Sequence, residues 1–346
     1  MQSSREKTDF NTLPYEAQLT RLTALAKRAI VFYGLDGATI TLTSYTNNAV
    51  FMVDSAKGIF TLRLHRAGMK SLTGLRSEWV WMKTLAENGV YLPTPVGDIY
   101  TGTLEDEPLP VYCTLTTWLK GEHIAFLDMT DDHIKTIGKF IGQLHSVASE
   151  FVPPADFERP TYDYDGLFGE NSPYNPKDGA KIFTDEQKAV MAEVQARVAD
   201  TFSRMGKSSD TFGLIHADLI PTNLIWDNNR VGAIDFEYCG YGYYLYDLTP
   251  FLWMTRNEPN IAHVRLMVWE GYTQARPQHE AYMTELDTMI MARHVASCRW
   301  IAGNLSNPSV RDRAPQVIAE RVAEMKSFLM QPKKHIIKAD KPNGEK

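Results

Sequence analysis

The sequence predicts an α+β fold in two lobes, a small N-terminal antiparallel sheet plus a helix and a larger, mostly helical C-terminal lobe. Two observations support this. Three strand-like runs, one helix and two further strand-like runs follow one another up to residue 116. Beyond residue 121, apolar residues recur at intervals of three and four, the period of an amphipathic helix. We therefore expect an N-terminal lobe at 1–116, a hinge at 117–121, a C-terminal lobe at 122–332 and a loose tail at 333–346.

The N-terminal lobe begins with a helical pattern that runs from Leu22 to Tyr33 and ends at Gly34. A second helical pattern runs from Leu75 to Ala86 and ends at Gly89. Turn-forming residues separate the strand-like runs, and the turn at 46–48 contains Asn47 and Asn48. The predicted strands cover residues 38–45, 49–54, 59–65, 96–100 and 111–116.

The C-terminal lobe is predicted to be helical around one long loop. Residues 134–148 form an amphipathic pattern, and a capping box from Thr184 to Gln187 opens another helix. The intervening stretch, 153–179, is rich in Pro, Asp, Gly, Asn and Tyr, and loops of that length are often functional. Further helical stretches are expected near residues 244–256, 261–274, 280–305 and 312–330.

Composition narrows the class of protein. The 346 residues carry a formal net charge of −6, which argues against a nucleic-acid partner. The three cysteines are widely spaced and form neither a zinc pattern nor a disulfide framework, which fits a reducing cytoplasm. The N-terminus is polar, and no apolar run is as long as a membrane span. We therefore expect a cytoplasmic protein without a membrane partner, and the oligomeric state stays open.

The most informative stretch is residues 216–223, His-Ala-Asp-Leu-Ile-Pro-Thr-Asn, followed by Asp235. An apolar run at 212–215 predicts a strand that leads into this loop. Two more apolar runs, 224–226 and 231–234, flank a polar cluster of turn formers and predict a hairpin. Asn223 and Asp235 then lie at the open end of this hairpin, where they can be neighbours in space.

The spacing His-x-Asp-x4-Asn is that of the catalytic loop of protein kinases. In that chemistry Asp218 accepts the proton of the substrate hydroxyl, and Asn223 and Asp235 hold magnesium. Carboxylate and carboxamide oxygens are hard ligands suited to this ion. These three residues predict phosphoryl transfer from ATP.

The segment Gly213–Asp247 resembles the signature of the aminoglycoside phosphotransferase/choline kinase family, and in outline the resemblance covers about residues 20–300. It implies a two-lobed protein-kinase-like fold and phosphorylation of hydroxyls, mostly on small molecules. The family usually has Gly where this chain has Ala217. A family Asp that braces the catalytic loop corresponds to Asp247.

The resemblance also assigns nucleotide-binding residues in the N-terminal lobe. Arg63 stands where the family usually has Lys, so it is expected to grip phosphate and to be held by Glu78, fifteen positions on. No G-x-G-x-x-G is present, and the turn that includes Asn48 is expected to cover the phosphates instead.

The hinge is expected to bind the base of the nucleotide. Backbone groups of Thr116, Thr117 and Trp118 should meet the adenine edge, so their side chains carry little information.

The predicted function is an ATP- and magnesium-dependent phosphotransferase that acts on a small-molecule hydroxyl, such as an amino alcohol, a hydroxy amino acid or an aminoglycoside. Asp163, Asp165 and Asp178 could attract a cation, although surface solvation explains them equally well, and Arg293 and Arg299 could hold a carboxylate.

Two alternatives stay open: a bacterial protein Ser/Thr kinase of the same family and a pseudokinase that binds nucleotide without turnover. The lack of an Ala-Pro-Glu segment argues against an ordinary protein kinase. The preference for ATP over GTP is not indicated.

Overall fold

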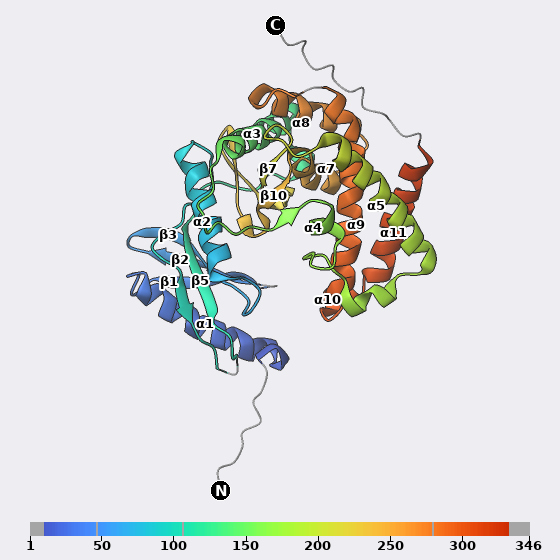
Figure 1. Cartoon of the computed structure of the whole chain (residues 1–346). Coiled ribbons are helices and arrows are strands. Elements are labelled where there is room, and N and C mark those ends of the chain that lie inside the picture. Colours follow the sequence, from blue (N-terminus) through green and yellow to red (C-terminus); the bar gives the residue numbers. More distant parts are fainter. Residues whose placement is uncertain (1–9, 46–47, 106, 279, 332–346) are drawn as a thin grey trace. The chain divides into compact units, whose positions relative to one another are not determined.

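The computed structural model describes residues 10–45, 48–105, 107–278 and 280–331. The chain forms two compact units (Figure 1). The first comprises the described residues up to Gly121 together with Pro153–Arg159, and the second comprises Glu122–Val152 and those from Pro160 onward. The return of residues 153–159 to the first unit is not evident from the sequence, where they form part of a long polar loop.

The first unit contains an antiparallel sheet of five strands in the order β1-β2-β3-β5-β4. This confirms the small antiparallel sheet predicted for the N-terminal part. Helix α2 begins after Ser71, whose side chain accepts a hydrogen bond from the backbone N–H of Gly74. The elements are α1 (Tyr15–Phe32), β1 (Thr39–Tyr45), β2 (Ala49–Ser55), β3 (Gly58–Leu64), α2 (Leu72–Glu87), β4 (Tyr100–Gly102) and β5 (Val111–Thr117).

The core of this unit follows from its sequence periodicities. Along β2, buried and half-buried residues alternate, so Phe51 and Val53 point inward. Helix α1 buries a stripe that includes Leu25 and Ala29, as its apolar spacing predicts. These side chains belong to one apolar cluster that also contains Leu115 of β5.

The strand predicted at 96–100 lies too early in the chain, because β4 covers Tyr100–Gly102. Pro95 makes one isolated bridge to Thr116, and the backbone N–H of Val96 donates to the carbonyl of Leu115. Gly97 then adopts a φ of 71°, which an extended strand does not accommodate. The ladder breaks there and resumes three residues later at Tyr100.

The second unit is mostly helical, as predicted. Its helices are α3 (Asp131–Glu150), α4 (Tyr164–Phe168), α5 (Asp185–Met205), α6 (Tyr244–Asp247), α7 (Thr249–Met254), α8 (Ile261–Ala275), α9 (Leu286–Gly303), α10 (Pro308–Arg311) and α11 (Ala314–Met330). Its strands are β6 (Thr161–Tyr162), β7 (Phe212–Ile215), β8 (Leu224–Asp227), β9 (Arg230–Ala233) and β10 (Gly240–Tyr243). The predicted capping box at Thr184 and Gln187 is confirmed at the start of α5.

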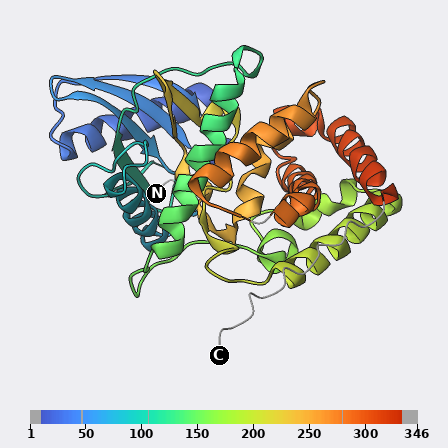
Figure 2. The same cartoon turned by 90° about the horizontal axis from the view of Figure 1, so that it is seen from above.

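Helices α3 and α8 lie along each other (Figure 2). Gly138 makes this approach possible, since a Cβ atom there would lie 2.0 Å from the carbonyl oxygen of Val268. Strands β6, β10 and β7 form a three-stranded sheet in that order, with α3 in contact with β7, and β8 pairs with β9 as a separate hairpin. Residues 216–223, the most informative stretch of the sequence, connect β7 to this hairpin.

The long loop at 153–179 has more structure than the sequence predicts. It contains β6 and α4, and a 3-10 helix begins at Lys177. Asp163 caps α4 through a hydrogen bond from the N–H of Gly166 and pairs with Lys207 at 2.6 Å. A local structural role therefore accounts for this acidic residue.

In the described part of the chain, helices lack the combined length and apolar character that a membrane span requires. The cysteines at positions 113, 239 and 298 are buried, and none of the three forms a disulfide bond.

Candidate active site

The predicted strand–loop–hairpin is confirmed. Strand β7 ends at Ile215, a short 3-10 turn covers Pro221–Asn223, and β8 begins at the next residue. The backbone N–H of Ile234 donates to the carbonyl of Asn223 at 2.9 Å. Asn223 and Asp235 are therefore neighbours at the open end of the hairpin.

The buried carboxylate of Asp247 binds the backbone at the start of the loop 216–223. Its Oδ2 accepts the backbone N–H of His216 at 2.8 Å, and its Oδ1 accepts that of Ala217 at 2.7 Å. The Nε2 atom of His145 lies 3.1 Å from the same Oδ2. Burial alone would raise the pKa of Asp247, but the contact with His145 and the other hydrogen bonds keep this pKa below its ordinary value. These contacts confirm the bracing role expected of Asp247.

Ala217 adopts a left-handed backbone with a φ of 67°. For an L-residue other than glycine this conformation costs roughly 1–2 kcal/mol, which is why the usual family glycine suits this position. The hydrogen bond to Asp247 compensates for this strain. The resulting turn directs the next residue, Asp218, away from the buried brace.

Asp218 is partly exposed, and its two carboxylate oxygens have different surroundings. Oδ1 accepts a hydrogen bond from the guanidinium of Arg293 at 2.6 Å. Oδ2 receives a long contact of 3.4 Å from the side-chain amide of Asn223. Oδ1 therefore has a close ionic partner, whereas Oδ2 has only the long contact with Asn223.

The surroundings of Asn223 suit a metal ligand. Its amide nitrogen donates to the backbone carbonyl of Asp218 at 2.9 Å, which leaves the amide oxygen free of protein donors in the described chain. Asp235 adds a carboxylate on a left-handed backbone with a φ of 64°. Two hard oxygen donors side by side match the ligand chemistry of magnesium. The described residues contain no cluster of three or more His, Cys, Asp and Glu, so the assignment depends on this pair.

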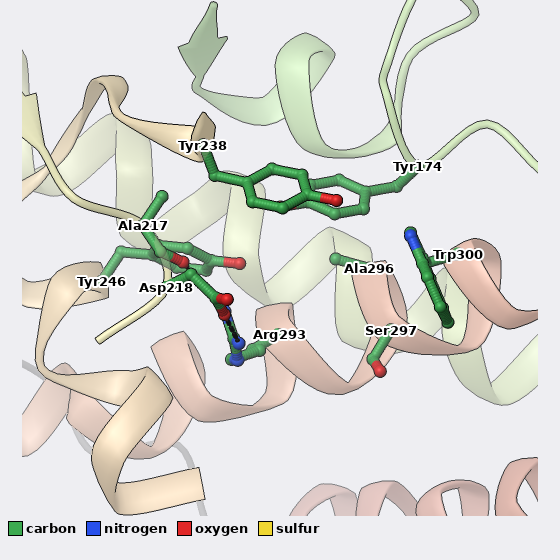
Figure 3. Close-up of a pocket in the computed structure, with 9 residues that line it drawn as sticks. All are labelled: Tyr174, Ala217, Asp218, Tyr238, Tyr246, Arg293, Ala296, Ser297 and Trp300. Carbon is green, nitrogen blue, oxygen red and sulfur yellow. Dashed lines mark hydrogen bonds and ion pairs between the residues drawn. The ribbon is translucent and has the colours of Figure 1, made fainter. Parts of the chain in front are cut away.

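Asp218 opens into a pocket of about 190 Å³ within the second unit (Figure 3). Aromatic rings, two alanines and a serine make up most of its wall. The lining residues are Tyr174, Ala217, Asp218, Tyr238, Tyr246, Arg293, Ala296, Ser297 and Trp300. Figure 3 shows the carboxylate of Asp218 and the guanidinium of Arg293 joined on one side of this space. The sequence does not single out the aromatic residues, because they come from separate segments of the chain that only tertiary packing brings together.

The N-terminal residues predicted to bind phosphate lie in the first unit. Arg63 is half-buried on β3, where it faces Thr114 of β5 in the strand register. Glu78 on α2 is buried and forms an ion pair with Arg159, 3.3 Å apart, and both side chains are less than a tenth exposed. Sequence reasoning missed Arg159, which lies 81 residues away from Glu78. The expected pairing of Glu78 with Arg63 stays a prediction.

At the hinge, two of the three predicted backbone N–H groups are used within the first unit. That of Thr117 donates to the carbonyl of Thr94 at 2.9 Å, and that of Trp118 donates to Ile59 at 3.1 Å. The side-chain oxygen of Asn48 accepts the backbone N–H of Arg66 at 3.1 Å. Thr116 pairs with β3 in the sheet. Thr46 and Asn47, which complete the predicted turn, lie outside the described residues.

The model of the phosphotransferase enzyme family matches residues 40–282, more than half of the chain. The chain belongs to this family. The resemblance seen in the motif region is thereby confirmed.

Related sequences include kinases of different small molecules. Amicoumacin kinase of Bacillus subtilis (strain 168) is 23% identical over 230 residues, which are 64% of this chain and 64% of that kinase. This match spans slightly less than two thirds of the relative. A homoserine kinase of Gluconobacter oxydans (strain 621H) is 27% identical over 258 residues, 70% of this chain and 74% of that kinase.

Solved structures share the fold at low sequence identity. A microcompartment-associated aminopropanol kinase has a TM-score of 0.78 at 22% identity and covers 89% of this chain and 97% of its own. An amicoumacin kinase in complex with AMP-PNP, Ca2+ and Ami has a TM-score of 0.74 at 17% identity and covers 90% of this chain and 96% of its own. These likenesses establish the kinase-like fold.

We predict that Asp247→Asn destabilises the protein and slows any turnover. The amide that replaces one oxygen cannot accept a backbone N–H, and hydrogen bonds to a buried charge contribute about 1.5–3 kcal/mol each. A misplaced Asp218 should lower kcat about 100-fold. Thermal unfolding and steady-state kinetics measure the two effects, with Asp131→Asn on the exposed start of α3 as the matched control. Equal unfolding midpoints for the two variants would contradict the bracing role.

We also predict that Glu78 and Arg159 are energetically coupled. Removal of one member of a buried ion pair costs about 3–5 kcal/mol, because the remaining charge is left uncompensated. Glu78→Gln and Arg159→Met should each lower the free energy of unfolding, and the double variant should lose less than the sum. Denaturant unfolding of the single and double variants measures this, with exposed Glu87→Gln on the same helix as control. Strict additivity would show that the pair contributes nothing.

Proposed function

We propose that this protein is an ATP- and magnesium-dependent kinase that phosphorylates the hydroxyl of a small, amine-bearing alcohol in the cytoplasm. The observation that supports it best is the position of Asp218, which lines a pocket of about 190 Å³ and has one carboxylate oxygen held by Arg293. Membership of the family indicates phosphoryl transfer, and the pocket indicates the size and the chemical character of the acceptor.

Each predicted residue has a physical role in this reaction. Asp218 orients the acceptor hydroxyl and accepts its proton. Asn223 and Asp235 would hold the magnesium, which neutralises the charge that develops on the transferred phosphoryl group. Arg63 would bind phosphate oxygens.

The remaining predicted residues would bind and hold the nucleotide. Backbone groups of Thr116, Thr117 and Trp118 would receive the adenine, and Asn48 would help to cover the phosphates. Glu78 would keep the basic side chains of the first unit in place.

The size of the pocket favours a small acceptor. A pocket of about 190 Å³ suits an amino alcohol or a hydroxy amino acid better than an aminoglycoside with its several rings. The faces of Tyr174, Tyr238 and Trp300 suit an ammonium group through cation–π attraction.

A coupled ADP-release assay with a graded series of hydroxyl compounds tests the proposal. We expect ethanolamine, aminopropanols, choline and homoserine to include the best acceptor, and kanamycin to be a poor one. Turnover should require magnesium, and Asp218→Asn should lower kcat by about 10²–10⁴-fold with little change in ATP affinity. The absence of phosphoryl transfer to the whole series, together with tight nucleotide binding, would favour the pseudokinase alternative. Efficient labelling of a protein substrate would favour the protein kinase alternative.

A further inference from the structure

Arg293 reaches the catalytic loop from α9 and contacts two successive residues. One terminal nitrogen donates to Oδ1 of Asp218 at 2.6 Å, and the other donates to the carbonyl of Ala217 at 3.0 Å. The planar guanidinium thus bridges a side chain and the backbone that carries it. The contact with the backbone orients the guanidinium, and the oriented guanidinium anchors Oδ1 of Asp218.

Arg293 is itself held in place. Its side chain is 13% exposed, and its guanidinium carbon lies 5.4 Å from the centre of the Trp253 ring. Arg256 and Arg321 lie against the same ring, at 4.9 and 4.8 Å. Arg256 is anchored by Glu324 at 2.9 Å. The guanidinium that meets Asp218 therefore belongs to a packed array of aromatic and charged groups.

We propose that Arg293 is a positioning residue for phosphoryl transfer, which holds Oδ1 of Asp218 so that Oδ2 faces the acceptor hydroxyl, and that its engagement with Asp218 restricts the acceptor to amino alcohols without a carboxylate. This inference rests on the proposed kinase function and narrows its substrate class.

The exclusion of carboxylates follows from the charges in the pocket. Among the described lining residues, Arg293 carries the only full positive charge, and Asp218 already uses it. An acceptor carboxylate would compete with Asp218 for the same guanidinium and would place two like charges near each other, which is unfavourable. An ammonium group meets aromatic faces, and the one guanidinium in the wall has its charge offset by Asp218.

A double-mutant cycle between Arg293 and Asp218 tests the positioning role. Arg293→Met removes the fork and should lower kcat about 100-fold, with KM for ATP changed less than about threefold. Arg293→Lys, which offers a point charge in place of a planar fork, should recover part of the loss. In an Asp218→Asn background the same Arg293→Met change should cost less than about threefold, because the group that it positions is already absent.

Arg197→Met on α5 is the matched control. Arg197 is 14% exposed, close to the 13% of Arg293, and it donates to the carbonyls of Phe328 and Gln331, away from Asp218 and Ala217. This variant should keep kcat within about threefold of the wild type. Thermal unfolding of every variant, measured alongside, shows which ones are folded.

Pairs of acceptors that differ by one carboxylate test the substrate class. 3-Aminopropan-1-ol is homoserine without its carboxylate, and 1-aminopropan-2-ol is threonine without its carboxylate. We expect the member without a carboxylate to have a kcat/KM at least about tenfold higher in the wild type. In Arg293→Met this preference should not fall, since the lost guanidinium had no part in binding a carboxylate.

The outcomes separate the two proposals. A kinase that prefers homoserine or threonine, and loses that preference in Arg293→Met, would overturn the restriction on acceptors while leaving the kinase function intact. Equal effects of Arg293→Met in the presence and absence of Asp218 would overturn the positioning role. No phosphoryl transfer by the wild type to any acceptor, with only coupled effects on unfolding, would overturn the kinase function and reduce the contact to a structural one.

Discussion

The buried carboxylate of Asp247 accepts hydrogen bonds from two successive backbone amides, and the geometry of the catalytic loop depends on this contact. A fully buried charge is stable only when it is well satisfied, and here His145 and two N–H groups satisfy it. The paired amides impose the left-handed turn at Ala217, and that turn directs Asp218 toward the pocket. A structural carboxylate thereby determines where the reactive one lies.

The charges around the pocket are balanced by their immediate neighbours, and the net charge of −6 of the whole chain does not indicate this. Three guanidiniums lie against Trp253, and one of them bonds to Asp218. Burial would lower the pKa of Arg293, but the Tyr246 hydroxyl and the Asp218 carboxylate raise this pKa above its ordinary value, so the side chain stays charged. The pocket therefore contains a matched pair of charges inside an aromatic wall.

Local patterns are enough to predict the parts of the fold that depend on neighbouring residues. Alternation and turn chemistry correctly predict β1, β2 and β3, and the apolar runs at 212–215, 224–226 and 231–234 correctly predict the strand and the hairpin that flank the loop. The strand predicted at 96–100 is misplaced because Gly97 takes a positive φ that an apolar run does not reveal.

Contacts between distant segments cannot be predicted in this way. Arg293 meets Asp218 across 75 residues, and Arg159 meets Glu78 across 81. Each pair depends on how a helix is rotated against its neighbours, and a single sequence carries no pattern for that. The sequence suggests Arg293 as a binder of a carboxylate, and the carboxylate that it binds in the structure belongs to the protein itself.

A crystal structure of the protein with magnesium, AMP-PNP and its best acceptor is the most direct test of the site. The acceptor hydroxyl is predicted to lie about 3 Å from Oδ2 of Asp218, with Oδ1 still bound to Arg293 and with the metal held by Asn223 and Asp235. An acceptor whose hydroxyl lies out of reach of Asp218, or whose own polar group displaces Asp218 from Arg293, would contradict it.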